Sequence, residues 1–308
     1  MKKIVKLLLP IIATFFLLWY LFRQTTLSDI SATFQKSSPL YMLIGFGLYI
    51  LCNILRGMRF KFLIKEKIPS LTIINIAFVN NMANNMFPAK TGEVSYPYLL
   101  KKSGISLPMS LSSLLVARLY DFIALSFIFL LTLFFAVIPF ALPKEIMVIT
   151  GSILIIAIIL VSLVIYGNHA LKKIIKKLFK GRLYEEKVLE IFDLSGEHRA
   201  KTGSLLVVSV LLWIINFTSL FFILQSLHIA VTIWQTFFIC IFYVFLPLLP
   251  FNGIAGFGTA EAYWSAMFIL FGISQEIAIV SSFSFHIINV LYFVLPGLYG
   301  LYALRKSL

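Results

Sequence analysis

Charged side chains are scarce in this sequence, and acidic ones are the scarcest. Only 12% of the 308 residues are charged, with 12 acidic against 26 basic side chains, whereas 60% are hydrophobic. A soluble domain of this size needs more polar side chains to cover its surface. Apolar runs long enough to cross a bilayer recur along the chain, whose mean hydropathy is +0.99. The composition therefore predicts an all-α, polytopic membrane helical bundle.

Cysteine, histidine and the motifs of common enzymes are also rare or missing. The chain has two cysteines and four histidines. Cys52 and Cys240 lie in apolar segments without the spacing of a metal or redox site, so we expect them to be small packing residues. The sequence contains neither His-Glu-x-x-His nor Gly-x-Ser-x-Gly, the signatures of zinc peptidases and serine hydrolases. We expect no catalytic residue, no metal and no cofactor.

The excess of basic residues, which gives a formal net charge of +14, follows the expected topology. If the amino terminus is cytoplasmic, all of the 26 basic residues except Arg23, Lys36, Lys90, Arg118 and Lys144 fall in cytoplasmic segments. This bias is the positive-inside rule, so no nucleic-acid partner is needed. We predict a multi-pass protein of the cytoplasmic membrane with both termini in the cytoplasm. About eight spans are expected, at 4–22, 40–63, 111–138, 146–166, 204–227, 232–249, 259–273 and 276–303.

Segment 71–100 lies between the second and third spans and is broken at Phe87-Pro88. Basic residues flank it on both sides, at Lys65 and Lys67 and again at Lys101 and Lys102. Because cytoplasmic loops carry such residues, both ends should lie on the same side of the membrane. We therefore predict a re-entrant helical hairpin with short half-spans.

The long polar loop 167–203 opens with an amphipathic helical pattern between 171 and 180. Leucine, isoleucine and phenylalanine occupy one face and five lysines the other, as in helices that lie in an anionic membrane interface. Either the helix gathers anionic lipid near a site, or it is a topology anchor that links two halves. We expect one membrane domain, 1–308, with this loop as its cytoplasmic linker.

Two apolar stretches are interrupted in the same way, one in each half of the chain. Each break is rich in proline or glycine and ends at a glutamate, Glu93 in the first and Glu261 in the second. Irregular backbone at membrane depth is tolerated only where it lines a cavity or is buried in protein, and a pair of such breaks points to a transporter's binding site. We predict a weak two-half repeat with these hinge residues: Pro88, Gly92, Pro250, Gly253, Gly256 and Gly258.

Ionisable residues in the apolar segments are the candidate ligands, since each costs roughly 2.5–3.5 kcal/mol at the centre of a membrane helix. Arg118 and Asp121 are three residues apart and should pair. Either they form a structural ion pair, or Arg118 is shared between Asp121 and an anionic substrate group. Lys90 suits phosphate, as do free N–H groups if Thr91 or Gly92 caps a helix. An ordinary cap beside a lysine that reaches the interface is the alternative. The carboxylates could hold a cationic head group or a proton. The expected substrate-binding residues are Arg56, Arg59, Asn84, Asn85, Lys90, Glu93, Arg118, Asp121 and Glu261.

Three further patterns concern the same two breaks. Asn80, Asn81, Asn84 and Asn85 form a polar stripe, which predicts either interhelical hydrogen bonds or a hydrated path. If Gly258 caps the next helix, Glu261 stands at the third position and can reach back to the cap N–H. His286 and Asn289 are three residues apart and form either a hydrogen-bonded packing pair or part of a proton relay.

These motifs together resemble one family. The order Arg56-x-x-Arg59, then Asn84/Asn85-x-x-Pro88-x-x-x-Gly92-Glu93, then Arg118-x-x-Asp121, then Pro250…Gly256-x-Gly258-x-x-Glu261, is similar to the lysylphosphatidylglycerol synthase transmembrane (flippase-like) family. That family includes the membrane half of the bacterial multiple peptide resistance factor, which protects against antimicrobial peptides.

The resemblance implies translocation of an anionic or aminoacylated phospholipid, such as lysyl-phosphatidylglycerol, between leaflets. Archaeal relatives imply a polyprenyl-phosphate-linked sugar as the alternative. The bifunctional relatives carry a further membrane segment and a soluble aminoacyl-transfer domain, which we expect this chain to lack. Two other functions stay open: a membrane-embedded head-group transferase of the phosphatidylglycerol lysyltransferase type, and a partner subunit of a separately encoded lipid-modifying enzyme. The expected partners are membrane lipids with phosphate head groups.

Overall fold

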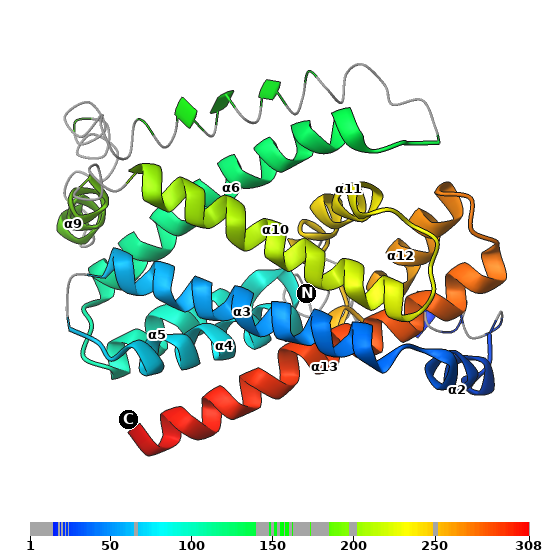
Figure 1. Ribbon diagram of the computed structural model, residues 1–308. Helices are drawn as coiled ribbons and strands as arrows, with labels where there is room; N and C mark the ends of the chain where they lie inside the picture. Colours follow the sequence, from blue (N-terminus) through cyan, green and yellow to red (C-terminus); the bar gives the residue numbers. More distant parts are fainter. Residues whose placement is uncertain are drawn as a thin grey trace, which may run out of the picture.

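The computed structural model describes residues 15–139 apart from 18, 20, 22, 24 and 65–66, isolated positions between 148 and 173, and then 185–196, 202–248 and 252–307. In these parts every regular element is a helix, which confirms the all-α membrane bundle (Figure 1). The predicted span 4–22 lies largely outside the described residues, as do the span 146–166 and the amphipathic stretch 171–180. Pro250 also lies outside them.

Four long helices match predicted spans in the described part of the chain. Each is apolar and long enough to cross a bilayer. At 1.5 Å per residue even a 25-residue helix reaches about 37 Å, more than the roughly 30 Å hydrocarbon core. Proline in the first turn, where no N–H partner is lost, helps to begin two of them. They are α3 (Pro39–Leu63), α6 (Leu107–Phe135), α10 (Thr202–Ser226) and α13 (Gln275–Ser307).

The spans predicted at 232–249 and 259–273 are wrong in length. The chain instead forms helices of 11 and 12 residues, α11 (Ile233–Tyr243) and α12 (Thr259–Leu270). Each is about 17–18 Å long, roughly half the hydrocarbon core. Between them the backbone makes two short 3₁₀ turns, η3 (Leu246–Leu248) and η4 (Ile254–Gly256). This proline- and glycine-rich break divides what composition suggested were full spans into a hairpin.

The first hairpin has the predicted form, with its break at Phe87. It consists of α4 (Ser70–Met86), the 3₁₀ helix η1 (Pro88–Val94) and α5 (Ser95–Lys102). Gly92 lets η1 fold back on α4, because a Cβ at this position would lie only 2.2 Å from the carbonyl carbon and oxygen of Ala83. No residue with a side chain fits here without displacing backbone.

The two halves of the chain run in opposite directions. Near one end of α3 the Ser38 N–H donates to the Ser226 carbonyl at 2.9 Å, and further along Ser219 Oγ donates to the Gly45 carbonyl at 2.8 Å. The two helices are therefore antiparallel neighbours. Each half has the order long helix, broken hairpin, long helix, as expected for a two-half repeat.

The two hairpins point toward each other. The α4–α5 hairpin starts at the end of the bundle near α9 (Glu185–Gly196) and the carboxyl terminus, whereas α11–α12 starts at the opposite end, near α2 (Leu27–Lys36) (Figure 1). Their breaks meet midway, where η1 contacts both η3 and η4. Two half-length elements thus bring irregular backbone to the middle of the bundle.

An apolar core surrounds each hairpin. Around α11–α12, Trp264 packs on Phe285 with ring centroids 4.1 Å apart. Around α4–α5, Phe60 packs on Tyr96 at 4.2 Å. Cys52 and Cys240 are fully buried in the first of these cores, as expected of packing residues. The polar side chains gather between the two cores.

Candidate functional site

Both hairpin breaks contain two consecutive residues in the left-handed region of the backbone. They are Ala89 (φ 54°) and Lys90 (φ 56°) in η1, and Ala255 (φ 53°) and Gly256 (φ 81°) in η4. Residues with a Cβ are rare in this conformation because it is sterically costly, and such strain is often found at binding sites. The repeat is therefore visible in the backbone of the two tips.

The helix cap expected at Thr91 or Gly92 is wrong. The residue that caps α5 is Val94, because the 3₁₀ helix η1 runs directly into α5. The Thr91 hydroxyl donates to the Pro88 carbonyl at 2.9 Å and stabilises the turn itself. The amides of this segment are therefore no open helix end for an anion.

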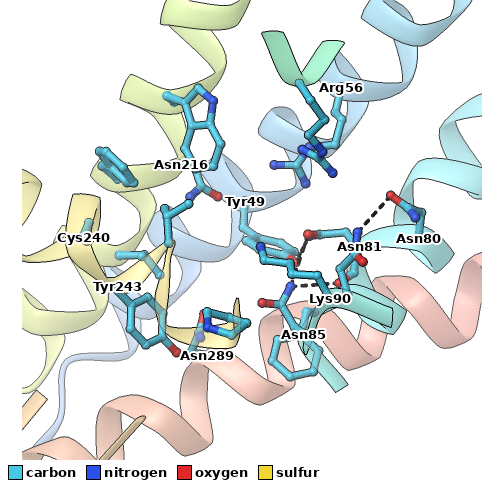
Figure 2. Close-up of a pocket in the computed structure, with 18 residues that line it drawn as sticks. Tyr49, Arg56, Asn80, Asn81, Asn85, Lys90, Asn216, Cys240, Tyr243 and Asn289 are labelled. Atoms are coloured by element: carbon cyan, nitrogen blue, oxygen red, sulfur yellow. Dashed lines mark hydrogen bonds between the residues drawn. The ribbon is translucent and has the colours of Figure 1, made fainter. Parts of the chain in front are cut away.

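A polar cavity of about 800 Å³, part of it open to solvent, lies where the hairpins meet (Figure 2). Its wall includes three cationic residues and six asparagines, and among the described residues that line it there is no aspartate or glutamate. Helices from both halves supply this wall. Its polar and aromatic members are Tyr49, Arg56, Asn80, Asn81, Asn84, Asn85, Lys90, Arg118, Trp213, Asn216, Phe217, Tyr243, Asn289 and Phe293.

The asparagine stripe of α4 both makes hydrogen bonds and lines the cavity. The Asn85 amide donates to the Asn81 carbonyl at 2.8 Å, the Asn84 amide donates to Asn80 Oδ1 at 3.3 Å, and Asn81 donates to the Tyr49 hydroxyl. The buried Oδ1 of Asn84 has no hydrogen-bond partner. The interhelical hydrogen bonds drawn from the sequence are therefore present, and the stripe also forms part of the cavity wall.

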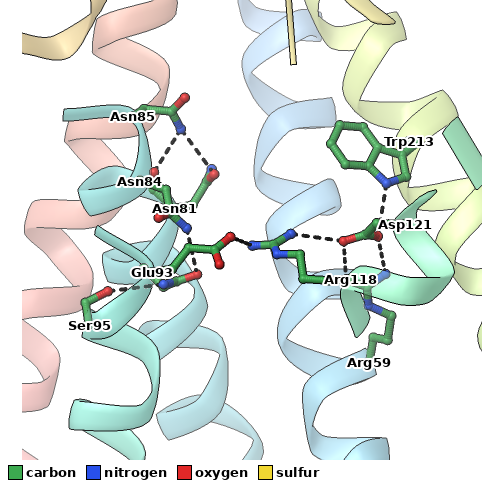
Figure 3. A network of polar contacts seen from close by, with 10 residues as sticks. Arg59, Asn81, Asn84, Asn85, Glu93, Ser95, Arg118, Asp121 and Trp213 are labelled. Carbon is green, nitrogen blue, oxygen red and sulfur yellow. Dashed lines mark hydrogen bonds and ion pairs between the residues drawn. The ribbon is translucent and has the colours of Figure 1, made fainter. Parts of the chain in front are cut away.

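Asp121 is the centre of a buried ion network (Figure 3). Arg59 approaches it with two nitrogens, Nη1 2.6 Å from Oδ1 and Nη2 3.2 Å from Oδ2. Arg118 Nη1 lies 3.0 Å from Oδ2, which confirms the expected pair, and the Trp213 indole donates to Oδ1 at 3.0 Å. Four hydrogen bonds from three residues thus satisfy both oxygens of this buried carboxylate.

The Arg59 side chain is buried in the bundle, although its position in the sequence suggested a residue that flanks a span. Its side chain is 1% exposed, and Nη1 also donates to Ser209 Oγ at 2.8 Å. The pairing with Asp121 allows this burial, because an unpaired guanidinium inside the bundle would cost several kcal/mol. Arg59 therefore positions the network and does not line the cavity.

Arg118 joins the network to the first hairpin. Its Nη2 lies 2.6 Å from Glu93 Oε1, and both side chains are about 30% exposed (Figure 3). The sequence suggested that Arg118 is shared between Asp121 and an anionic substrate. In the structure the second acceptor is Glu93 of η1, so a carboxylate of the chain occupies the place expected for the ligand.

The charges around the cavity do not cancel. Arg56 donates to Asn53 Oδ1 at 3.0 Å, and no described carboxylate forms an ion pair with it or with Lys90. Arg59 and Arg118 share the two carboxylates Asp121 and Glu93. Four cations against two anions leave an excess of two positive charges around this polar cavity, which favours anions there.

A second polar cluster lies behind the second hairpin tip. Glu261 is fully buried, and its Oε2 accepts the Gly258 N–H at 2.7 Å, which confirms the expected cap. His286 does not pair with Asn289 as expected. Its Nδ1 lies 2.7 Å from Glu261 Oε1, and its Nε2 lies 2.9 Å from the Ala255 carbonyl.

The glycines of this break have separate roles. The Gly256 N–H donates to the Gly253 carbonyl at 2.9 Å and closes the turn, while Gly256 and Gly258 both adopt positive φ. Glycine adopts this conformation without the steric cost of a Cβ. The chain can therefore turn twice within six residues and begin α12 beside the cavity.

The sequence reading missed several residues of the cavity wall. Trp213 and Asn216 both come from α10, and Tyr49 comes from α3. Asn216 was a visible signal, because an amide inside an apolar span is costly unless it is bonded or hydrated. Trp213 gave none, since a tryptophan in a membrane helix is equally common at lipid-facing positions.

Comparison with protein families agrees with the motifs. The model described as the lysylphosphatidylglycerol synthase TM region matches residues 6–297, which includes both hairpins, the helices α3, α6 and α10, and α13 up to residue 297. A search of curated proteins gave no match. Because the family model covers nearly the whole chain, the protein belongs to the family of lysylphosphatidylglycerol synthase transmembrane regions.

Proposed function

We propose that this protein moves a lipid with an anionic phosphate head group between the two leaflets of the membrane. The observation that carries the proposal is a cavity lined by three cationic residues and six asparagines at the meeting point of two opposed, broken hairpins. Transporters with inverted repeats bind their substrates at such sites near the middle of the bilayer.

Phosphate is the chemical group that best fits the wall. Arg56 and Arg118 offer planar guanidinium donors that can bind two phosphate oxygens at once, and Lys90 adds a point charge. The asparagine amides supply neutral donors and acceptors, including the unpartnered Oδ1 of Asn84. A glycerol or sugar hydroxyl next to the phosphate would satisfy this acceptor.

The Glu93–Arg118 contact provides a route from binding to movement. A phosphate that enters the cavity competes with Glu93 for the same guanidinium, whose Nη2 lies 2.6 Å from Glu93 Oε1. Loss of this contact would free η1 from α6, whereas the buried contact of Arg118 with Asp121 would remain. Substrate would thereby release the first hairpin. The half of the protein that contains this hairpin could then move relative to the other half.

The same geometry bears on the kind of head group. Asp121 is occupied by Arg59 and Arg118, and Glu261 by His286, so neither faces the cavity as a free carboxylate. Glu93, once displaced from Arg118, is the carboxylate that could hold the ammonium group of an aminoacylated lipid. We therefore propose an anionic phospholipid as the basic substrate, with the lysyl-phosphatidylglycerol type and the polyprenyl-phosphate-linked sugar as its extended forms.

The orientation is part of the proposal. Described basic residues gather at the bundle end that holds α9 and the carboxyl terminus: Lys61, Lys67, Lys101, Lys102, Arg305 and Lys306. The positive-inside rule then supports a cytoplasmic location for this end, and a cell membrane as the site of action. The α4–α5 hairpin would enter from the cytoplasm and α11–α12 from outside.

Translocation in proteoliposomes tests the function. Fluorescent anionic, aminoacylated and polyprenyl-phosphate lipids would be scored by quenching of the outer leaflet, for the wild type and for the cavity variants Arg56→Gln and Lys90→Gln. The exposed Lys102→Gln variant is the control, because this lysine lies outside the cavity. We expect faster quenching than in empty vesicles, lost in the cavity variants and kept in the control.

A wild-type rate equal to that of empty vesicles for every lipid would overturn the proposal. Two measurements would then address the remaining functions predicted from the sequence. Chemical change of the head group by purified protein would identify a transferase, and co-purification with a lipid-modifying enzyme would identify a partner subunit.

A further inference from the structure

The contacts of His286 with Glu261 and with the Ala255 carbonyl require two hydrogens, one more than a neutral imidazole beside an ionised carboxylate carries. His286 Nε2 lies 2.9 Å from the Ala255 carbonyl oxygen, which can only accept, so Nε2 carries a hydrogen. His286 Nδ1 lies 2.7 Å from Glu261 Oε1, a distance at which one of the two atoms must also carry a hydrogen. The pair therefore holds two protons in total.

Two arrangements satisfy this count. The second proton lies either on Nδ1, as imidazolium beside carboxylate, or on Oε1, as neutral imidazole beside a carboxylic acid. In both the pair has no net charge, as suits side chains that are 1% and 0% exposed. If one proton leaves, a single ring hydrogen remains for two acceptors, so a nitrogen lone pair faces either the Glu261 carboxylate or the Ala255 carbonyl, and the two atoms of that contact must separate.

Separation would release the second hairpin tip. His286 belongs to α13, while Glu261 opens α12 and Ala255 is the left-handed residue of η4. Through its two ring nitrogens His286 holds both ends of the break, and Glu261 Oε2 fixes the Gly258 N–H between them. Apolar packing such as that of Trp264 on Phe285 also joins α12 to α13, but the polar contacts that fix the break between α11 and α12 to α13 depend on the proton.

Other titratable side chains lie on the elements around this pair. Tyr243 of α11 is a titratable group that interacts electrostatically with Glu261. The helices α4 and α10 pack against α13 without any titratable side chain of their own, whereas α3 places Tyr49 against Tyr292 of α13. The 3₁₀ helix η1, which contacts η4, carries Lys90 and Glu93, and α12 carries Tyr263. On α2, which packs against α13, Asp29 and Lys36 are exposed, as is Glu276 in the first turn of α13.

A polar route connects the pair to the cavity. A smaller pocket of about 280 Å³ reaches Ala255 and Gly256 and shares Asn85, Tyr243 and other wall residues with the phosphate cavity. At Gly256 a Cβ would lie 3.6 Å from His286 Nε2, so the pocket ends beside the imidazole. A water molecule in this pocket would lie on the path between the imidazole and the cavity.

We infer that Glu261 and His286 form a binding site for the proton that couples a pH gradient to lipid translocation. With the proton bound, the α11–α12 hairpin is fastened to α13. When the proton passes to water in the smaller pocket, the hairpin is freed and the cavity can change the side to which it opens. This inference rests on the proposed lipid translocation. The two measurements below distinguish a failure of the inference from a failure of the proposed function.

The first measurement is proton binding itself, by ¹⁵N NMR of histidine-labelled protein in liposomes. The chain has four histidines, and a His286→Gln sample assigns the signal of interest. We expect this signal to change in the wild type between about pH 5 and pH 8, the range in which histidine switches operate. A signal that is constant over this range overturns the inference.

The Glu261→Gln variant sharpens this measurement. Its amide N–H can donate to Nδ1 while its carbonyl oxygen accepts the Gly258 N–H, so both contacts persist without a removable proton. We expect the His286 signal of this variant to stay that of neutral imidazole at every pH. An unchanged titration in the variant would contradict the shared proton.

The second measurement compares lipid translocation with and without an imposed pH gradient. We expect a gradient to accelerate lipid translocation by the wild type and by the control Glu276→Gln, whose carboxylate is exposed. The Glu261→Gln variant should lose this acceleration while it still folds and binds anionic lipid. Wild-type translocation that ignores the gradient overturns the coupling. If the NMR signal changes with pH as expected but no lipid is translocated, the proposed function and the coupling are overturned. The proton site itself then stands.

Discussion

Arg59 and Asp121 form a two-point ion pair between α3 and α6, with Nη1 2.6 Å from Oδ1 and Nη2 3.2 Å from Oδ2. Their side chains are 1% and 6% exposed, so the pair is held almost without water. Such pairs add little net stability relative to apolar residues, but they are costly to break because one charge stays buried. The bundle therefore depends on both partners.

Replacement of Asp121 with asparagine should destabilise the protein strongly. Arg59 would keep its charge in a buried site with a neutral partner, at a cost of about 3–5 kcal/mol. Thermal unfolding in detergent, followed by size-exclusion chromatography of the heated protein, measures the loss. The control Glu276→Gln removes an exposed carboxylate and should leave the unfolding temperature unchanged. Equal unfolding temperatures for both variants would refute a structural role for the pair.

Replacement of Glu93 with glutamine should increase affinity for anionic lipid. The variant removes the carboxylate that competes with phosphate for Arg118, and both side chains are about 30% exposed. Exposed ion pairs contribute roughly 0.2–1 kcal/mol, so the gain in affinity is at most about fivefold. Binding of a fluorescent anionic phospholipid in detergent measures it. Weaker binding would mean that Glu93 contacts the lipid instead of competing with it.

Much of the membrane architecture could be predicted because it is encoded by local composition. Hydropathy placed the four long helices within a few residues, and the Phe87-Pro88 break placed the first hairpin. The second hairpin could not be distinguished from two full spans, because helices that cross all or half of the membrane have the same apolar composition. The short lengths of α11 and α12 are set by the break between them, which packs on η1 of the first hairpin.

The site was partly predictable for a related reason. Arg118 and Asp121 share a helix face, and Glu261 reaches back to Gly258, because both contacts depend on spacing along one segment. Contacts between distant segments left no such trace. Arg59 meets Asp121 across 62 positions, and His286 meets Glu261 across 25. A single sequence names the polar residues but does not pair them.

Replacement of Gly92 with alanine should disrupt the first hairpin. The new Cβ would lie 2.2 Å from the Ala83 carbonyl, which belongs to the backbone of α4 and cannot rotate away. Ordinary overpacking costs about 1–3 kcal/mol, and a clash with backbone belongs at or above the upper end. Gly47→Ala in α3 is the matched control, because nothing lies within 4 Å of its Cβ. The unfolding temperature should fall for Gly92→Ala alone. Equal unfolding temperatures of the two variants would contradict the close approach of Gly92 to the backbone of α4.

Replacement of Trp213 with phenylalanine tests the least obvious member of the ion network. The indole N–H donates to Asp121 Oδ1 at 3.0 Å, and phenylalanine keeps the ring contact with Phe217 while it removes this donor. Hydrogen bonds to charged groups contribute about 1.5–3 kcal/mol, so the loss should be clear but smaller than for Asp121→Asn. Trp234→Phe is the control, since this ring packs on Phe135 at 4.8 Å and no hydrogen bond from its indole to a described residue is present. If both tryptophan variants unfold at the same temperature, the indole of Trp213 serves packing, and Asp121 is held by the two arginines alone.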